Sequence, residues 1–176
     1  KGLSTLLAAF RKFPDRQLSL VGTGPMESKL RGYVADYQMK NVTFHGFQTG
    51  ESLRKLIQHA KYVVLPSKWY ENNPLTVIES YSFSVPVLGA QIGGIPEIVQ
   101  DEKTGFLFTH NDQDSLEEVL KKTFRQTDSG YRTLSENSGH FFANTFTRET
   151  YYTKLVHFYE KVKGNYDQAV NESADS

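Results

Sequence analysis

The sequence predicts an α/β fold in which a Rossmann-like parallel sheet is covered by helices on both faces. Short apolar runs alternate with segments whose apolar residues recur at helical spacing. The connections between these runs are long enough to hold a helix, as parallel strand pairing requires. Glycine-rich turns fall at the carboxyl ends of the runs, which is where folds of this class bind their ligands.

The predicted elements follow one another along the whole chain. Apolar residues at helical spacing predict a helix over residues 3–13, which Pro14 ends. Further helices are predicted at residues 26–37, 50–59, 74–83, 95–100, 115–120 and 129–144, and after Thr147. The predicted strands are residues 17–21, 41–46, 61–65, 85–89 and 104–108.

Composition excludes several classes of function. The chain has 20 basic and 20 acidic residues, and a net charge of zero argues against a surface that coats nucleic acid. It has no cysteine, so it forms neither a disulfide scaffold nor a thiolate metal site. No apolar run approaches the roughly 20 residues of a membrane span. The five histidines form no pair at ligand spacing, so no metal site is predicted.

The length of 176 residues fits one domain. We expect this domain to cover residues 1–164 and to be followed by a polar, disordered tail at 165–176. Lys1 and Gly2 open directly on a helical pattern without a methionine, which indicates an excised domain.

The stretch Trp69–Ser80 carries the main functional signal. Glu71 and Glu79 are separated by seven residues, and Pro74 lies between them. The run at 62–65 predicts a buried strand, and proline suits the first position of the helix that follows. Glu71 then lies in the loop, and Glu79 lies one to two turns inside the helix.

This arrangement suits a nucleoside diphosphate sugar. Asn72 or Asn73 can cap the helix, whose free N–H groups attract phosphate. A carboxylate at Glu79 can accept hydrogen bonds from ribose hydroxyls, and one at Glu71 can meet a neutral sugar. The alternative is that both carboxylates are merely solvated charges.

The segment ENNPLTVIES at 71–80 resembles the E-x7-E motif of retaining glycosyltransferases with the GT-B fold, in family 4, the glycosyl transferases group 1. Further matches are Lys1-Gly2, the G-x-G-P at 22–25, the G-G-x-x-E at 93–97 and the T-G-F-L at 104–107. The resemblance covers nearly the whole chain. It implies that the chain is the C-terminal, donor-binding half of such an enzyme, without the N-terminal acceptor domain.

The resemblance also implies a role for each matched residue. Glu71 would be the catalytic carboxylate at the transferred sugar, Glu79 would bind the ribose, and Lys1 would bind the diphosphate. The arginine that partners this lysine in the family is not in the sequence. The other implied donor-binding residues are Gly22, Gly24, Phe47, Gln48, Asn73, Leu75 and Thr76. For Phe47, ordinary core packing is an equally good interpretation.

The implied activity is transfer of a sugar from a nucleotide-sugar to a glycan, lipid or other acceptor, with retention of anomeric configuration and no metal or other cofactor. The fragment alone is expected to be inactive, because the acceptor site would lie in the missing domain. We expect a cytoplasmic location, with peripheral membrane association only through absent parts. The alternatives are a non-catalytic nucleotide- or partner-binding α/β domain, and a GT-B epimerase or phosphorylase.

The D-x-D at Asp112 and Asp114 is the metal-binding signature of the different, GT-A class. Because it precedes a predicted helix, we interpret both residues as capping and helix-dipole partners, and not as metal ligands.

Overall fold

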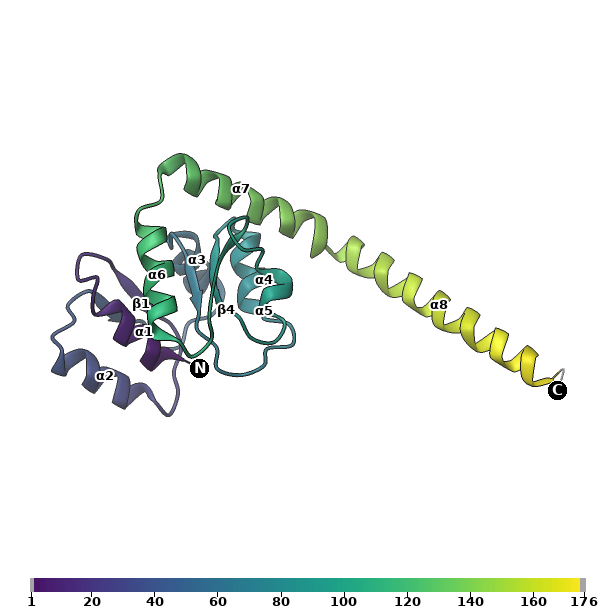
Figure 1. Ribbon diagram of the computed structural model, residues 1–176, viewed down its shortest axis with the longest axis horizontal. Coiled ribbons are helices and arrows are strands. Elements are labelled where there is room, and N and C mark those ends of the chain that lie inside the picture. Colours follow the sequence, from purple (N-terminus) through teal and green to yellow (C-terminus); the bar gives the residue numbers. More distant parts are fainter. Residues whose placement is uncertain (1, 175–176) are drawn as a thin grey trace.

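Five short strands alternate with eight helices in the computed structural model, which describes the backbone of residues 2–174 and the side chains of residues 2–165 (Figure 1). The strands are β1 (Leu18–Leu20), β2 (Val42–Phe44), β3 (Val63–Leu65), β4 (Val87–Ala90) and β5 (Gly105–Phe108). The helices are α1 (Leu3–Phe10), α2 (Glu27–Asp36), α3 (Gly50–Gln58), α4 (Leu75–Ser82), α5 (Ile95–Ile98), α6 (Gln113–Phe124), α7 (Asp128–Thr145) and α8 (Arg148–Ala174).

All strand pairs are parallel, which confirms the predicted α/β class with helices flanking the strands. The strands form two hydrogen-bonded ladders, β1–β2 and β3–β4–β5, where the sequence predicted a single sheet. At the outer edge of β3, the N–H of Gly2 donates to the carbonyl of Pro66 at 2.9 Å. The chain entering α1 therefore occupies the end of this edge, and no ladder joins β3 to β1 within residues 2–174.

Strand β4 lies at the centre of the larger ladder and is buried at every residue. Its pairing with β5 depends on Gly105, because a Cβ atom there would lie 1.9 Å from the carbonyl oxygen of Val87. Val87 and Leu88 are 0% and 1% exposed, and full burial of such side chains stabilises a fold by about 1.5–3 kcal/mol each.

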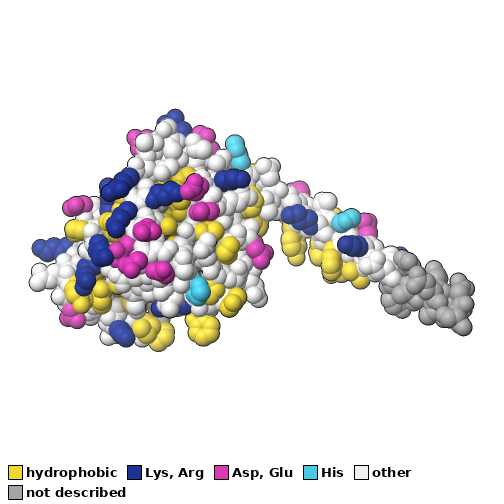
Figure 2. All heavy atoms as spheres, in the orientation of Figure 1, with side chains coloured by type: hydrophobic (Ala, Val, Ile, Leu, Met, Phe, Trp, Pro, Cys, Tyr) yellow, Lys and Arg dark blue, Asp and Glu magenta, His cyan; other side chains and the backbone are white. Residues whose placement is uncertain are grey.

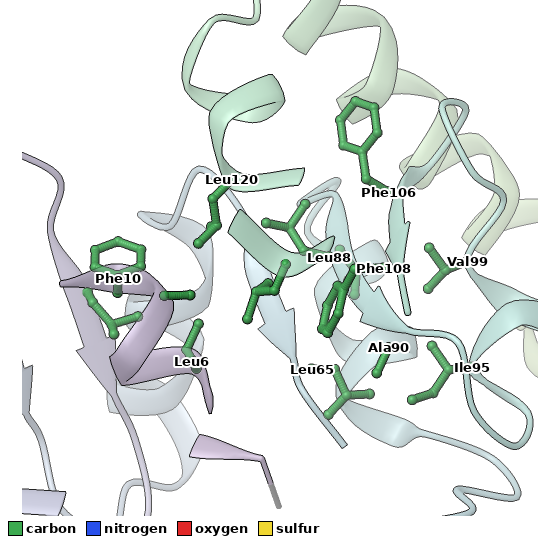
Figure 3. Close-up of a cluster of buried hydrophobic side chains, with 14 of the residues drawn as sticks. Leu6, Phe10, Leu65, Leu88, Ala90, Ile95, Val99, Phe106, Phe108 and Leu120 are labelled. Atoms are coloured by element: carbon green, nitrogen blue, oxygen red, sulfur yellow. The ribbon is translucent and has the colours of Figure 1, made fainter. Parts of the chain in front are cut away.

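One hydrophobic core joins both ladders and the helices around them. Figure 3 shows Leu6 and Phe10 of α1 in the same hydrophobic cluster as Leu88 of β4 and Phe108 of β5. The ring of Phe10 also packs edge-on against Phe124 of α6, with centroids 6.0 Å apart. The two ladders are thus held together by side-chain packing.

Several helix boundaries differ from the predicted ones, among them the ends of α1 and α8. Helix α1 ends at Phe10 and not at Phe13. The residues that follow form a turn whose hydrogen bonds span three residues and not four, since the N–H of Phe13 donates to the carbonyl of Phe10 at 2.9 Å. Helix α8 continues to Ala174, ten residues past the predicted domain end at 164.

Helix α8 extends away from the rest of the molecule (Figure 1). Its hydrophobic side chains gather along one side in Figure 2, and five of the large ones are 48–67% exposed. These are Tyr151, Tyr152, Phe158, Tyr159 and Val162. Helix α8 begins after Thr147, as predicted, and Thr147 caps it, because its hydroxyl accepts from the N–H of Thr150 at 3.1 Å.

Candidate active site

The candidate site lies along the carboxyl edge of the strands, where the loops after β1, β2, β3 and β4 emerge. Because the strands within each ladder are parallel, the loops after β1 and β2 leave one ladder at the same edge, and the loops after β3 and β4 leave the other ladder at the same edge. The loop after β3 carries Glu71 and leads directly into α4.

Glu71 is anchored through both its side chain and its backbone. The hydroxyl of Ser67 donates to Oε1 of Glu71 at 2.8 Å, and Ser67 is only 1% exposed. The N–H of Gly94 donates to the carbonyl oxygen of Glu71 at 2.6 Å. The carboxylate is half-buried, so the interpretation of Glu71 as a freely solvated loop charge is not supported.

Gly93 and Gly94 make this anchoring possible. Gly93 has a φ of +58°, and a Cβ atom there would lie 2.6 Å from the nitrogen and 2.7 Å from the carbonyl oxygen of Glu71. A Cβ atom at Gly94 would lie 2.5 Å from the carbonyl oxygen of Asn72. The turn between β4 and α5 therefore packs backbone to backbone against the Glu71 loop, and only glycine fits at these two positions.

The start of α4 differs from the prediction. Pro74 occupies the N-cap with a ψ of 91° and does not form the first helical residue, and neither Asn72 nor Asn73 caps the helix with its side chain. Proline tolerates both positions because neither needs its missing N–H. Among the described residues, no backbone carbonyl accepts from the N–H of Leu75 or Thr76.

These unpaired N–H groups at a helix N-terminus are the kind of donor that phosphate oxygens or sugar hydroxyls can use. Three predicted donor-binding residues lie here, and all are exposed: Asn73, Leu75 and Thr76. Leu75 is 64% exposed, which is unusual for a large apolar side chain.

Glu79 projects from α4 into an open cavity of about 500 Å³ between α3 and α4. Its carboxylate is exposed and forms no ion pair within the described side chains. The cavity is lined by Gly50, Glu51, Leu53, Arg54, Ile57, Gln58, Glu79, Ser82 and Phe83. Arg54 supplies a cation to this cavity, and nothing in the sequence pattern singled it out.

The turns after β1 and β2 touch each other. The N–H of Gly22 donates to the carbonyl of Gly46 at 2.7 Å, and Gly22 needs to be glycine because its φ is +112°. Gly24 has an ordinary φ and open space around it. Phe47 is 73% exposed, so the core-packing interpretation of this residue is wrong. The side chain of Gln48 donates to the carbonyl of His45 at 2.7 Å, which holds this side chain against the turn after β2.

Other predictions concern residues outside this edge. Asp112 is an N-cap, as predicted, because its Oδ1 accepts from the N–H of Ser115 at 3.1 Å. Asp114 lies in the first turn of the same helix, where an acidic side chain is favoured. Lys1 lies outside the described residues.

Neither a candidate metal cluster nor a helix able to span a membrane is present among the described residues. No three histidine, aspartate or glutamate side chains lie close enough to hold a metal ion. No helix there is both long and apolar enough to cross a membrane.

Comparisons with known proteins identify the family and the fold. Residues 1–139 match the model of the family described as glycosyl transferases group 1. The chain is 27% identical over 172 residues to the sulfoquinovosyl transferase SQD2 of Arabidopsis thaliana, covering 93% of this chain and 33% of that protein. The chain thus spans about a third of the length of that relative.

Solved structures resemble the fold closely. Sucrose-phosphate synthase from Thermosynechococcus elongatus aligns with a TM-score of 0.81 at 28% identity, over 94% of this chain and 43% of that one. Anabaena HepE, solved in complex with UDP-glucose, aligns with a TM-score of 0.81 at 21% identity, over 92% of this chain and 45% of that one. Because the family match covers most of its length, this chain belongs to the glycosyl transferases group 1 family and has the fold of GT-B glycosyltransferases.

Proposed function

We propose that this chain is the donor-binding domain of a retaining glycosyltransferase, and that its carboxyl edge binds a nucleotide-sugar. Glu71 meets the transferred sugar, Glu79 binds the ribose, and the N–H groups at Leu75 and Thr76 hold diphosphate oxygens. The single observation that carries the proposal is the anchored carboxylate of Glu71 just before a helix N-terminus with free N–H groups.

The arrangement supports this division of roles on electrostatic grounds. Unpaired N–H groups and the helix dipole favour a diphosphate at the start of α4. A fixed carboxylate beside them would repel a phosphate but would accept hydrogen bonds from sugar hydroxyls. Glu71 therefore suits the neutral sugar, which is the part of the donor next to the diphosphate.

The chemistry we propose does not use Glu71 and Glu79 as the nucleophile and acid of a retaining glycosidase. Instead the sugar leaves its diphosphate on the same face that the acceptor attacks, and the departing diphosphate assists removal of the acceptor proton. The main contribution of this domain is then stabilisation of the developing charge on the diphosphate by oriented N–H donors.

The proposal also covers the acceptor domain, the metal requirement and the donor. The acceptor site belongs to a further domain, consistent with the relative of which this chain spans only a third. The reaction needs no metal, so transfer should persist in EDTA. A nucleotide-sugar donor is supported by the HepE structure, which contains UDP-glucose.

The experiment measures donor binding and sugar transfer with the full-length protein. A panel of UDP-glucose, UDP-N-acetylglucosamine and GDP-mannose is titrated by calorimetry, and the nucleotide-sugar that binds most tightly is then used for turnover. Glu71→Ala and Glu79→Ala are compared with Glu136→Ala, which removes an exposed carboxylate from α7, on a different part of the molecule.

We expect Glu79→Ala to weaken binding of both the nucleotide-sugar and the free nucleotide. Glu71→Ala should abolish transfer while leaving the affinity for the free nucleotide intact, and Glu136→Ala should change neither. If no member of the panel binds, or if Glu71→Ala retains full transfer, the proposal fails, and a non-catalytic binding domain explains the fold better.

A further inference from the structure

We propose that Ser67 is a positioning residue, which fixes the Glu71 carboxylate through one oxygen so that the other oxygen meets the substrate. A tight contact with Gly93 and Gly94 fixes the backbone of the same residue. This inference rests on the proposed function, in which Glu71 contacts the transferred sugar.

Ser67 is placed to do this by the strand before it. It follows β3 directly after Pro66, whose carbonyl accepts from Gly2 at 2.9 Å, so its backbone is held between strand and loop. A buried hydroxyl needs a partner, and in Ser67 that partner is Oε1 of Glu71 at 2.8 Å. The bond spans four residues of a loop, so helix geometry does not impose it.

The hydrogen bond divides the carboxylate into two unequal oxygens. Oε1 accepts from Ser67, whereas Oε2 has no hydrogen-bond partner among the described side chains. Rotation of the carboxylate would break the bond to Ser67, so the hydroxyl selects one orientation. A group held in its productive orientation before the substrate arrives spares the cost of ordering it during the reaction.

The backbone of Glu71 is fixed independently of its side chain. Its carbonyl oxygen accepts from the N–H of Gly94 at 2.6 Å, and its nitrogen would be 2.6 Å from any Cβ atom at Gly93. Ser67 therefore acts on a side chain whose Cα position is already set. Loss of the hydroxyl should change the orientation of the carboxylate more than the path of the loop.

The first test is Ser67→Ala in the full-length protein. Because a hydrogen bond to a charged group is lost, kcat should fall about 10- to 100-fold. The affinity for the free nucleoside diphosphate should stay within about twofold of wild type, because Ser67 acts only on the sugar-facing carboxylate. The nucleotide-sugar should bind more weakly, so that its advantage over the free nucleotide shrinks.

Ser138→Ala is the matched control. Ser138 is similarly buried, at 0% exposure. Its single hydroxyl hydrogen is shared between the carbonyls of Leu134 and Thr104, at 2.8 and 3.0 Å, and it forms no hydrogen bond with the Glu71 loop. A general loss of stability should lower the transfer rate of both variants alike. The positioning role requires that Ser67→Ala lowers kcat far more than Ser138→Ala does.

A double-mutant cycle with Glu71→Ala then separates positioning from structure. The cycle is read by calorimetry with the nucleotide-sugar and the free nucleotide, so it does not depend on turnover. If Ser67 acts through the Glu71 carboxylate, Ser67→Ala should change the nucleotide-sugar affinity by less than about twofold in the Glu71→Ala background, where no side-chain oxygen is left to accept from the hydroxyl.

An equal effect of Ser67→Ala in both backgrounds would overturn the inference, as would a kcat loss no larger than that of Ser138→Ala. Failure of the proposed function looks different, because Glu71→Ala itself would then leave transfer intact. The two failures are therefore distinguishable in one set of proteins.

Discussion

Substitution of Gly93 by alanine tests the contact between the β4–α5 turn and the Glu71 loop. Two separate penalties are expected. Alanine at a φ of +58° costs about 1–2 kcal/mol, because the left-handed region is unfavourable for a residue with a Cβ atom. The Cβ atom would also lie 2.6 and 2.7 Å from two backbone atoms of Glu71, so one of the two segments has to move.

Gly50 offers a matched control for the first penalty. Its φ is +57°, but a Cβ atom there has open space within 4 Å. Gly50→Ala should therefore lower the free energy of unfolding by about 1–2 kcal/mol. Gly93→Ala should lower it by a further 1–3 kcal/mol or so, the usual cost of forcing extra atoms into a packed site.

The assay is chemical denaturation of both variants and wild type, followed by thermal unfolding, in which each kcal/mol corresponds to about 2–4 °C. Gly93→Ala should also lower the transfer rate, because Glu71 is displaced. Equal destabilisation by the two substitutions would refute the reasoning, since it would mean that the Glu71 loop accommodates a Cβ atom without strain.

Further predictions concern stability and pH. Burial alone would raise the pKa of Glu117, but hydrogen bonds from Gln113 and Lys12 hold that pKa below its usual value. The resulting stability should therefore be complete near neutral pH and should be lost as the pH falls below about 4.5 and passes through the lowered pKa. Lys12→Met should destabilise the fold by about 1–3 kcal/mol at pH 7 and by less at pH 4, measured by denaturant titration, and an equal loss at both pH values would contradict this. Tyr81→Phe should cost about 1 kcal/mol in the same titration, because it removes the buried bond of 2.7 Å to the hydroxyl of Thr104, and no loss would contradict the importance of that bond.

The elements were predictable because their signals are local. Short apolar runs predicted β1 to β4, and the match to the T-G-F-L segment of the family predicted β5. Asp112 before an apolar pattern predicted the cap of α6. The start of α4 was misplaced by one residue, because proline is equally acceptable at the N-cap and at the first helical position.

The anchoring of Glu71 could not be predicted in this way. Ser67 and Glu71 meet in a loop, where no periodicity fixes which side chains face each other. Gly94 is 23 positions from Glu71 in the sequence, and their contact depends on β3 and β4 being neighbours in one ladder. The exposure of Phe47 could not be predicted either, because an aromatic residue after a strand is compatible with a core position and with a ligand site.

The most direct test of the account is a nucleotide-sugar titration of the full-length protein followed by the backbone amide signals of this domain. The account predicts shifts at Gly22, Gln48 and Leu75–Glu79 when the best-binding member of the panel is added. Saturable binding that shifts none of these amides, and instead shifts residues away from the carboxyl edge, would contradict the placement of the donor site.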